Sequence, residues 1–496
     1  MRRKGGKNMK KKQTIIVSIL LACILLLASS TVMIFWFINK SGEEAEVNYE
    51  LFSAWTDVEV FQTIPVMTGE SIKIGKAIDY GSQHYLLDVN GATVEEYNAY
   101  LDVLVKAGYV KHSDNGEDAM EGTVHTASFQ KDNVTVVVAH IINAEKTYIS
   151  AAYDMELSDH MIYDEEAATT FVDGAKTKVH MLELNNNGSC FIFQLKNGHF
   201  MIQDSGTNYD APYLFDYLDE LTPGDETPVV EGWFISHPHA DHYGGLRELA
   251  TNKKYKDRVY VNEVYFHRPS DEMLISTEED LGIDPAYADM VEDLCYLLTA
   301  EDGGTAKGFR PQLGQRYYFC DMYVDVSMTP EQIVMEEKTE DDVNDTSIWV
   351  MNHIEGQRFL IGADAARLSC HAAMNLLGKE YLSVDIFAVL HHGINVYNFF
   401  TDYVEFDVAL YPGFRLGSLY SSKSPIAARW GFAREEENEH LIEKAKEEYS
   451  FANGTVILTF PYTMGTAEIA EPCDWRYSNN GPKGRYADWG WEKGDL

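Results

Sequence analysis

The stretch that decides the fold is Ile235-Ser236-His237-Pro238-His239-Ala240-Asp241-His242-Tyr243-Gly244-Gly245, near the middle of a chain of 496 residues. Three imidazoles and a carboxylate fall within six residues there, directly after an apolar run. A tight loop at the end of a strand can turn such side chains toward one point, and imidazole and carboxylate are preferred ligands of zinc, iron and manganese. The stretch therefore predicts a metal site, with a solvated polar loop as the alternative.

Further candidate ligands follow other apolar runs of the chain. Three segments each place them directly after residues with strand character: Asp204, Asp364, and the pair His391 and His392. Open α/β folds build their sites at the carboxyl ends of strands. We therefore expect these side chains to lie beside the loop at 237–242.

The order and spacing of these residues resemble the metallo-β-lactamase superfamily, whose signature is His-x-His-x-Asp-His. The resemblance covers about residues 175–470. It implies an αββα sandwich, in which two β-sheets pack face to face between layers of helices. Gly244 and Gly245 would let the following helix start close to the site.

A narrower resemblance concerns the hydrolase domain attached to bacterial competence DNA-uptake proteins. The His-His-Gly triplet at 391–393 and the Asn-Asp-Thr-Ser run at 344–347 are similar to it. Two positions depart from the family, since Ala363 stands where glycine is usual and Ile394 where serine is usual. The membrane channel of those proteins has many spans, and this sequence has one apolar span.

The resemblance implies a role for each matching residue. His237 and His239 would hold a first divalent metal. Asp241 and His242 would hold a second, and Asp364 would bridge the two. Catalysis would depend on the loop residues His237, His239 and Asp241, with Asp241 also steadying the attacking water.

Other positions have supporting roles or stay open. One of His391 and His392 would complete the second metal site, and the sequence does not decide which. Asp204 would act behind the ligands by accepting a hydrogen bond that orients the loop. Asn344 is a candidate weak ligand or substrate contact, and His267 is a candidate further ligand of the first metal.

Five further histidines are expected to be structural: His84, His125, His140, His353 and His371. The first three have no carboxylate or cysteine neighbours at ligand spacing, His353 falls on an expected hairpin turn and His371 on an expected helix.

The implied chemistry is metal-assisted hydrolysis. Two divalent ions about 3.5–4 Å apart bring the pKa of a shared water to about 7, and the hydroxide attacks a phosphodiester or ester. Zinc is the expected metal, with manganese or iron as alternatives. Diiron relatives place glutamate where His239 stands, so His239 favours hydrolysis over redox chemistry. The competing function is a catalytically inactive surface binding or scaffold protein on the same fold.

The amino terminus has the pattern of a membrane anchor. Residues 1–12 carry seven basic residues and no acid, and 14–38 run for 25 residues without a charge. A helix of that length crosses a hydrocarbon core of about 30 Å. We expect a single-pass cell-membrane protein with its anchor at 13–39, the basic arm in the cytoplasm and the remainder extracytoplasmic. Cleavage after 28–30 and lipid attachment at Cys23 are the alternatives.

Beyond the anchor, four segments are expected: a tether at 40–61, a small α+β domain at 62–170, the hydrolase domain at 171–472 and an aromatic-rich tail at 473–496. In the small domain, Thr93 and Glu96 form a capping box that predicts a helix ending near Gly108. In the hydrolase domain, Tyr317–Val326 predicts one long strand and 435–447 a helix.

The charge limits the partners. The chain has 40 Lys and Arg against 78 Asp and Glu, a formal net charge of −38. Such a field repels long polyanions, so nucleic acid is disfavoured despite the narrower resemblance. We expect a small molecule or an envelope polymer as substrate, with Arg415, Lys423 and Arg429 as candidate contacts for one phosphate or carboxylate. Six cysteines without a CxxC pair exclude a disulfide-stapled scaffold.

Overall fold

The structure is a computed structural model, and all the residues it describes belong to the unit Phe52–Leu496. The expected arm at 1–12, anchor at 13–39 and tail at 473–496 lie outside them, as do the three candidate contacts after residue 413. Within the described ranges, no helix is both long and apolar enough to cross a membrane. The described residues are 55–81, 83–116, 119–184, 188–224, 226–270, 291, 306–330, 343–393, 397–413, 441, 443–451 and 454–471.

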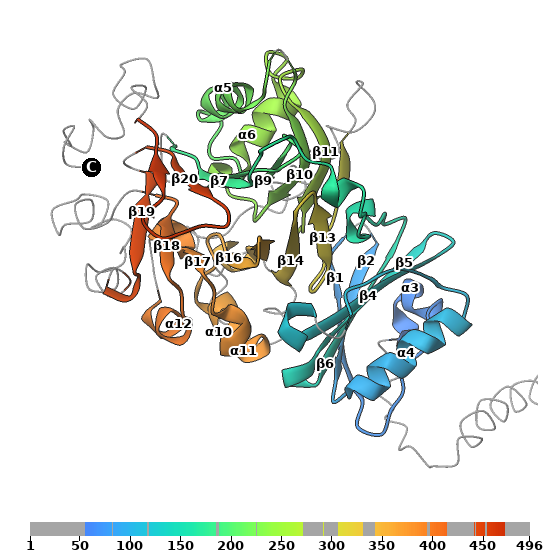
Figure 1. The fold of residues 1–496 in the computed structure, drawn as a ribbon. Coiled ribbons are helices and arrows are strands. Elements are labelled where there is room, and N and C mark those ends of the chain that lie inside the picture. Colours follow the sequence, from blue (N-terminus) through green and yellow to red (C-terminus); the bar gives the residue numbers. More distant parts are fainter. Residues whose placement is uncertain are drawn as a thin grey trace, which may run out of the picture. The chain divides into compact units, whose positions relative to one another are not determined.

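The first part, called the small domain and spanning Trp55–Tyr153, is a six-stranded antiparallel sheet with order β1-β2-β6-β5-β4-β3 (Figure 1). Along the chain, short turns join β1 to β2, β4 to β5 and β5 to β6, whereas α4 stands between β2 and β3 and the turn η1 between β3 and β4. Its elements are α3 (Glu59–Gln62), β1 (Lys73–Asp79), β2 (His84–Asn90), α4 (Val94–Lys106), β3 (Val110–Asp114), η1 (Ala119–Gly122), β4 (Val124–Lys131), β5 (Val134–Ile141), η2 (Ile142–Ala144) and β6 (Lys146–Tyr153).

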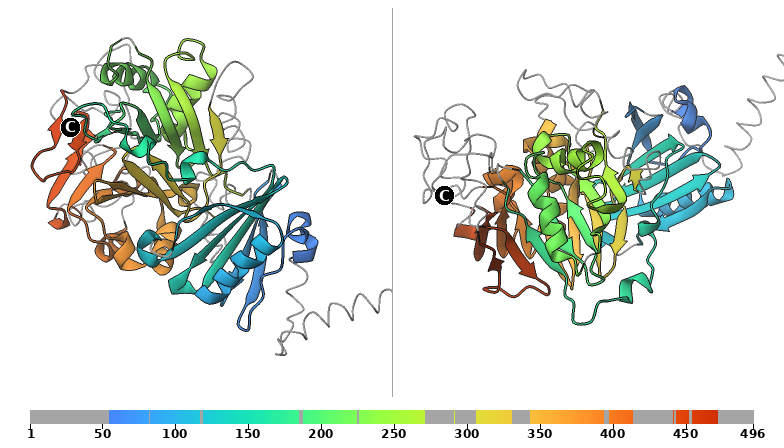
Figure 2. Two further views of the ribbon diagram at one scale, coloured as in Figure 1. Left: turned by 45° about the vertical axis from the view of Figure 1, so that its right-hand side comes forward. Right: turned by 90° about the horizontal axis from the view of Figure 1, so that it is seen from above.

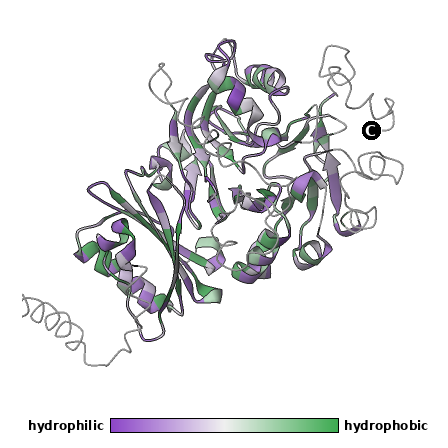
Figure 3. Ribbon diagram, turned by 180° about the vertical axis from the view of Figure 1, so that it is seen from behind, coloured by the Kyte–Doolittle hydropathy of each residue, from purple (hydrophilic) through white to green (hydrophobic). Residues whose placement is uncertain are grey.

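Helix α4 forms where the sequence predicts it. The Thr93 side chain accepts from the backbone N–H of Glu96, and the Glu96 side chain accepts from that of Thr93, so the capping box is complete. Tyr97, Leu101 and Leu104 are buried against the sheet. Polar and apolar residues alternate along the helix in Figure 3, as they do in an amphipathic helix.

The prediction of a tether at 40–61 is wrong for its last residues, which are part of the folded small domain. Trp55, Val60 and Phe61 are buried and belong to the core of the small domain. The indole N–H of Trp55 also donates to the carbonyl of Ile64 at 3.1 Å. One turn of helix gave too short a periodic pattern to be seen in the sequence.

The second part, called the sandwich domain and spanning Lys178–Ile469, contains two sheets (Figures 1 and 2). Two single turns, η3 (Asp159–Met161) and η4 (Ala167–Thr169), precede it. Its eight-stranded sheet has the order β12-β11-β10-β9-β8-β7-β20-β21, with β9 to β12 parallel. Those strands are β7 (Lys178–Met181), β8 (Phe191–Gln194), β9 (Phe200–Gln203), β10 (Val229–Ile235), β11 (Tyr260–Phe266), β12 (Lys307–Phe309), β20 (Val456–Thr459) and β21 (Glu468–Ile469).

The seven-stranded sheet runs β13 to β19 in sequence order. Its strands are β13 (Arg316–Phe319), β14 (Met322–Met328), β15 (Trp349–Ile354), β16 (Gln357–Ile361), β17 (Ile386–Ala388), β18 (Val408–Tyr411) and β19 (Glu447–Ser450). The helical elements are α5 (Ala211–Leu221), α6 (Ala240–Thr251), η5 (Val343–Thr346), α10 (Arg367–Leu376), α11 (Gly378–Leu382), η6 (Leu390–Gly393) and α12 (Asn398–Tyr403).

The two sheets bury one continuous core between them. Phe191 of the first sheet meets Phe359 of the second with ring centroids 5.5 Å apart. Helices α5 and α6 pack on the eight-stranded sheet, and α10 to α12 pack on the seven-stranded sheet. These four layers are the αββα sandwich that the sequence predicts, with the small domain as an additional sheet.

Two expected elements differ from the structure. Tyr317–Val326 is not one strand but the hairpin β13–β14, in which Cys320 turns the chain at φ +51°. The predicted helix at 435–447 lies partly outside the described residues. Residues 441, 443 and 444 are helical as predicted, but the helix ends before Glu447, which begins strand β19. Both differences fall where the local sequence carries no glycine or proline signal.

Candidate metal centre

The signature loop lies where β10 ends and α6 begins. His239 is the N-cap residue of α6 and has extended backbone angles. Only a few residues therefore separate the strand from the helix, and the candidate ligands on this short loop stay close together. A Cβ atom added at Gly244 would lie 2.2 Å from the backbone nitrogen of Asn208. Glycine there lets α6 approach the loop after β9, as the sequence predicts.

The other sheet brings the remaining ligands to the same place. Asp364 follows β16, and His392 lies in η6 after β17. Ala363 and His392 both have positive φ, +47° and +55°, so the backbone turns sharply at each. The His391 N–H donates to the carbonyl of Ala363 at 2.9 Å, which ties the two turns together.

Seven candidate donors were expected, and six form two groups. The first group is His237, His239 and Asp364, and the second is Asp241, His242, Asp364 and His392; within each group the donor atoms lie within 4.8 Å of one another. Asp364 belongs to both groups. This is the bridging position that the resemblance implies.

Asp364 is the geometric centre of the site. Its Oδ1 lies 3.2 Å from His242 Nε2, and its Oδ2 lies 3.2 Å from His392 Nε2. Oδ2 is also 3.9 Å from His237 Nε2, which in turn is 2.8 Å from His239 Nδ1. Asp241 Oδ2 lies 3.4 Å from His392 Nε2.

These donors fit divalent cations. The Nε2 atoms of His242 and His392 are buried, and neither has hydrogen-bond geometry to any partner. A buried nitrogen left in this way is destabilising unless something else binds it. Histidine and carboxylate donors suit zinc or iron, so the residues present match the metals that the sequence predicts.

Asp204 supports the loop from behind. It follows β9 at φ +58° and accepts from the backbone N–H of Ser236 at 2.8 Å and from the Ser236 hydroxyl at 2.9 Å. Its Oδ2 also accepts from His242 Nδ1 at 2.7 Å. The expected role of Asp204 therefore has a defined geometry. His392 is oriented in the same manner, because its Nδ1 donates to the carbonyl of Pro412 at 2.9 Å.

Charge within the centre is balanced between imidazoles and carboxylates. Burial, and then the neighbouring His242 and His239, hold the pKa of His237 well below its usual value. Burial also opposes the charged form of His392, but Asp364 and Asp241 outweigh it and raise its pKa to about 10. Burial acts against ionisation of Asp364 too, yet the surrounding histidines keep its pKa well below the usual range. A metal ligand must be neutral imidazole, so metal binding has to displace the His392 proton.

The centre has one open side. The side chains of His237 and His242 are fully buried, and those of His392 and Asp364 nearly so. Asp241 keeps 34% of its side-chain surface exposed and His391 keeps 18%. Among the described residues, the centre is therefore least covered at Asp241 and His391.

The remaining candidates lie outside the two groups. His391 Nε2 is 3.7 Å from Asp364 Oδ2 but belongs to neither group, so of the two adjacent histidines it is His392 that lies among the candidate donors. His267 donates through Nδ1 to the carbonyl of Pro311 at 2.7 Å and faces Tyr80 of the small domain. His353 stacks on Tyr323.

His371 and Asn344 also lie outside the two groups. His371 stacks on Phe399, as a structural histidine does. Asn344 is buried in η5, and Ile348 just after it donates to the carbonyl of Ser236 at 3.0 Å, so this loop lies against the signature loop. The sequence reasoning missed Ser236 and Pro412. Ser236 directly precedes His237, and that adjacency was the one available signal.

The family follows from this geometry and from one comparison. Residues 185–312 match the metallo-beta-lactamase superfamily. The sandwich domain, with its signature loop and shared aspartate, belongs to that superfamily. The comparison with curated proteins gives no match.

Three solved structures with some likeness to this chain are distant from it in sequence. The metallo-beta-lactamase fold protein YhfI from Bacillus subtilis is 14% identical, and the likeness covers 43% of this chain and 71% of that chain with a TM-score of 0.27. CmlA, a diiron beta-hydroxylase from Streptomyces venezuelae, is 11% identical over 75% of this chain and 78% of that chain, with a TM-score of 0.32. A metallo-beta-lactamase superfamily protein from Thermotoga maritima is 10% identical over 48% and 77%, with a TM-score of 0.22. Scores this low carry no argument about function.

Proposed function

We propose that this protein is a metal-dependent hydrolase that uses a dinuclear centre to cleave a phosphodiester or ester. The observation that supports it most is the pair of donor groups that share Asp364. An inactive relative would be expected to have lost one or more of these donors. Here the signature loop, the shared aspartate and a late histidine are all present and oriented.

Each residue has a defined task in the proposed reaction. When bound, the two cations supply Lewis-acid chemistry and make water acidic enough to react near pH 7. His237, His239, His242 and His392 hold neutral nitrogens toward the centre. Asp364 joins the two groups, and its negative charge offsets part of the metal charge. Asp241, on the open side, accepts a hydrogen bond from the attacking water and orients it toward the substrate.

The charge of the chain favours a small substrate or an uncharged stretch of polymer. A net charge of −38 disfavours nucleic acid, because long polyanions are repelled before contact. An envelope phosphodiester or an ester head group satisfies both the centre and the charge. We also propose that the anchor at 13–39 holds the enzyme on the outer side of the cell membrane, where such substrates occur.

Metal content and hydrolysis test the proposal. The purified chain is expected to contain about two equivalents of zinc, iron or manganese and to hydrolyse bis(p-nitrophenyl) phosphate or a p-nitrophenyl ester. A chelator should abolish turnover, and added metal should restore it. His237→Ala should lose activity while the protein stays folded, and His371→Ala, a histidine outside both groups, serves as the control.

Opposite results would support the inactive scaffold. Protein prepared without chelator that contains no metal contradicts the hydrolase proposal. So does full turnover in the His237→Ala variant. Finding bound metal with no turnover on phosphodiesters, esters or lactams would favour a binding role for the same centre. Membrane attachment is tested separately, since deletion of 13–39 should release the chain from washed membranes.

A further inference from the structure

The hydroxyl of Ser236 lies behind the two metal groups, within reach of one histidine from each. Its Oγ is 2.9 Å from Asp204 Oδ2, 3.0 Å from His237 Nδ1 and 3.3 Å from His242 Nδ1. The residue is buried, with 7% of its surface exposed. A buried hydroxyl among three polar atoms has little freedom to rotate.

The number of hydrogens on each group determines which atom donates in these three contacts. A serine hydroxyl has one hydrogen, and an ionised carboxylate only accepts, so Ser236 donates to Asp204. The lone pairs of Ser236 Oγ are then left to accept, and His237 Nδ1 is within reach as the donor. His242 Nδ1 lies closer to Asp204, at 2.7 Å, and donates to that carboxylate instead.

We infer that Ser236 is a positioning residue that holds His237 in its Nδ1–H tautomer. With the proton on Nδ1, the lone pair of Nε2 faces Asp364 and the first metal group. Asp204 does the same for His242 in the second group. The inference rests on the metal centre proposed above and assigns a separate supporting residue to each of the two groups.

The first group depends strongly on this support. It has three protein donors, whereas the second has four, and Asp364 is shared between them. Loss of one well-oriented nitrogen therefore removes a larger fraction of the metal-binding free energy from the first group than from the second. Partners that orient a ligand histidine typically contribute about 10–100-fold in metal affinity.

Removal of the hydroxyl leaves the backbone contacts intact. The Ser236 N–H still donates to Asp204 Oδ1 at 2.8 Å, and the Ser236 carbonyl still accepts from Ile348 at 3.0 Å. Alanine is smaller than serine and fits the same space. Ser236→Ala thus tests the hydroxyl alone.

The experiment measures zinc binding in two backgrounds, each of which weakens one group. In a His392→Ala background the first group is complete and the second lacks one of its four donors, and in a His239→Ala background the second is complete and the first lacks one of its three. Adding Ser236→Ala to the first background should weaken zinc binding about 10–100-fold, measured by competition with a chromophoric chelator. Asp204→Asn should weaken zinc binding more when it is added to the second background than when it is added to the first. Ser236→Thr keeps the hydroxyl. Adding it to the first background should therefore leave the zinc affinity unchanged.

Several outcomes would overturn the inference. Unchanged zinc affinity after Ser236→Ala in the His392→Ala background contradicts it. If that variant does not fold, nitrogen-15 spectra of the otherwise unchanged chain decide, because His237 protonated on Nε2 is incompatible with the assigned contact. Failure of the unchanged chain to bind zinc, iron or manganese at all would instead refute the proposed function, so the two failures are distinguishable.

Discussion

His391 and His392 are adjacent in sequence but have different surroundings, and this difference can be tested. His392 is buried, donates to Pro412 and belongs to the second metal group, whereas His391 is partly exposed and belongs to neither group. We predict that His392→Ala removes about one of the two metal equivalents, because the first group keeps all three of its donors, and that it lowers turnover by more than the roughly 100-fold typical of supporting residues. His391→Ala should keep its metal.

The paired variant supplies the control for this prediction. Both changes remove one imidazole from the same turn, so a general effect on the backbone at 391–393 would appear in both. Metal analysis of the two purified variants measures the difference. Equal metal loss in both would contradict the selection of His392.

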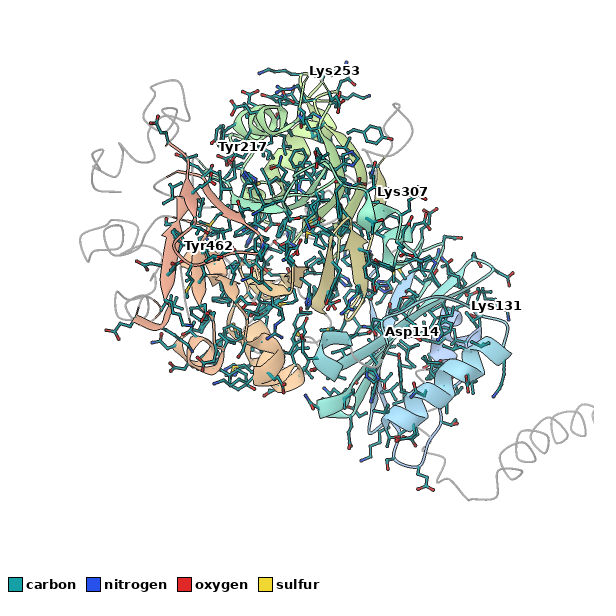
Figure 4. The ribbon with its side chains drawn as sticks, viewed as in Figure 1. Asp114, Lys131, Tyr217, Lys253, Lys307 and Tyr462 are labelled. Atoms are coloured by element: carbon teal, nitrogen blue, oxygen red, sulfur yellow. The ribbon has the colours of Figure 1, made fainter. Side chains whose placement is uncertain are left out.

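His180 gives a prediction about acid stability. Burial, with a smaller contribution from Lys178, lowers the pKa of His180 to about 3, and its Nδ1 shares a hydrogen bond of 2.9 Å with the hydroxyl of Tyr217 on α5 (Figure 4). The unfolded chain takes up this proton near pH 6.5 and the folded chain does not. The stabilisation is therefore complete above pH 6.5 and falls by about 1.4 kcal/mol per pH unit as the pH drops toward 3.

Replacement of the imidazole should remove that slope. Between pH 6 and 4, the free energy of unfolding of His180→Asn should depend less steeply on pH than that of the unchanged chain, by about 1.4 kcal/mol per unit. Urea unfolding at several pH values measures it. His371→Asn, at an exposed histidine, should leave the slope unchanged, and identical slopes in all three proteins would count against the prediction.

At the residue level, the sequence predicted which donor side chains lie together better than it predicted the residues that orient them. The candidate donors stood out because histidine and aspartate together in a short loop are rare outside metal sites. The choice between His391 and His392 was not available, since it depends on the positive φ of both residues and on the carbonyl of Pro412. Ser236 was missed because a serine in a polar loop has no distinctive pattern.

Helix α4 shows how local chemistry can determine an element. Besides the capping box, the Glu96 side chain accepts from the backbone N–H of Glu70 at 3.1 Å, so one carboxylate holds two segments. We predict that Glu96→Ala destabilises the protein by about 1–2 kcal/mol, because both backbone donors lose a charged acceptor. Chemical denaturation measures the change.

The neighbouring glutamate is the matched control for Glu96. Glu95 occupies the same first turn and is exposed, so it shares the favourable position near the helix N-terminus without closing the capping box. Glu95→Ala should change the stability by about 0.5 kcal/mol or less. Equal losses in the two variants would show that charge at the helix end, and not the two specific bonds, is what stabilises α4.

Elements were predicted where their ends carry chemical signals and missed where they do not. The capping box marked α4, and the signature loop marked the end of β10. The hairpin β13–β14 was taken as one strand because Cys320 is not a typical turn residue and a single aspartate, Asp321, is too weak a turn signal within an aromatic run. The left-handed angle of Cys320 is imposed by pairing of the flanking strands. Strand β19 was missed because acidic residues near 447 resemble an exposed helix.

At the scale of the whole molecule, the fold was predicted from one motif and the order of a few others, whereas the placement of the small domain was not. The described part of the small domain packs on the outer face of the seven-stranded sheet and shares a buried cluster with it, including Tyr80, Leu86 and Tyr148 beside Trp349 and Met351. These contacts join residues separated by hundreds of positions. No local pattern in a single sequence reports such packing.

Polar contacts fix the same placement. The Asn115 side chain donates to the carbonyl of Gly314 at 2.6 Å, and the Thr126 hydroxyl donates to that of Leu313 at 3.1 Å. Arg358 forms an ion pair with Glu121 at 3.1 Å. Because the cluster and these bonds join the two domains, we expect them to unfold as one cooperative unit and not independently.

Gly314 allows that expectation to be tested with a single methyl group. Its φ is +76°, and an added Cβ would lie 2.1 Å from Thr126 Oγ1 on β4 of the small domain. Gly356 has nearly the same φ, +78°, but an added Cβ there would meet nothing within 4 Å. Both alanine variants incur the left-handed backbone penalty of about 1 kcal/mol, while Gly314→Ala must also displace the Thr126 and Val124 side chains of β4. We predict a loss of about 2–4 kcal/mol for Gly314→Ala and about 1 kcal/mol for Gly356→Ala, with one calorimetric transition in each metal-free protein. Equal losses would mean that β4 does not lie against residue 314, and a second transition would mean that the domains unfold separately.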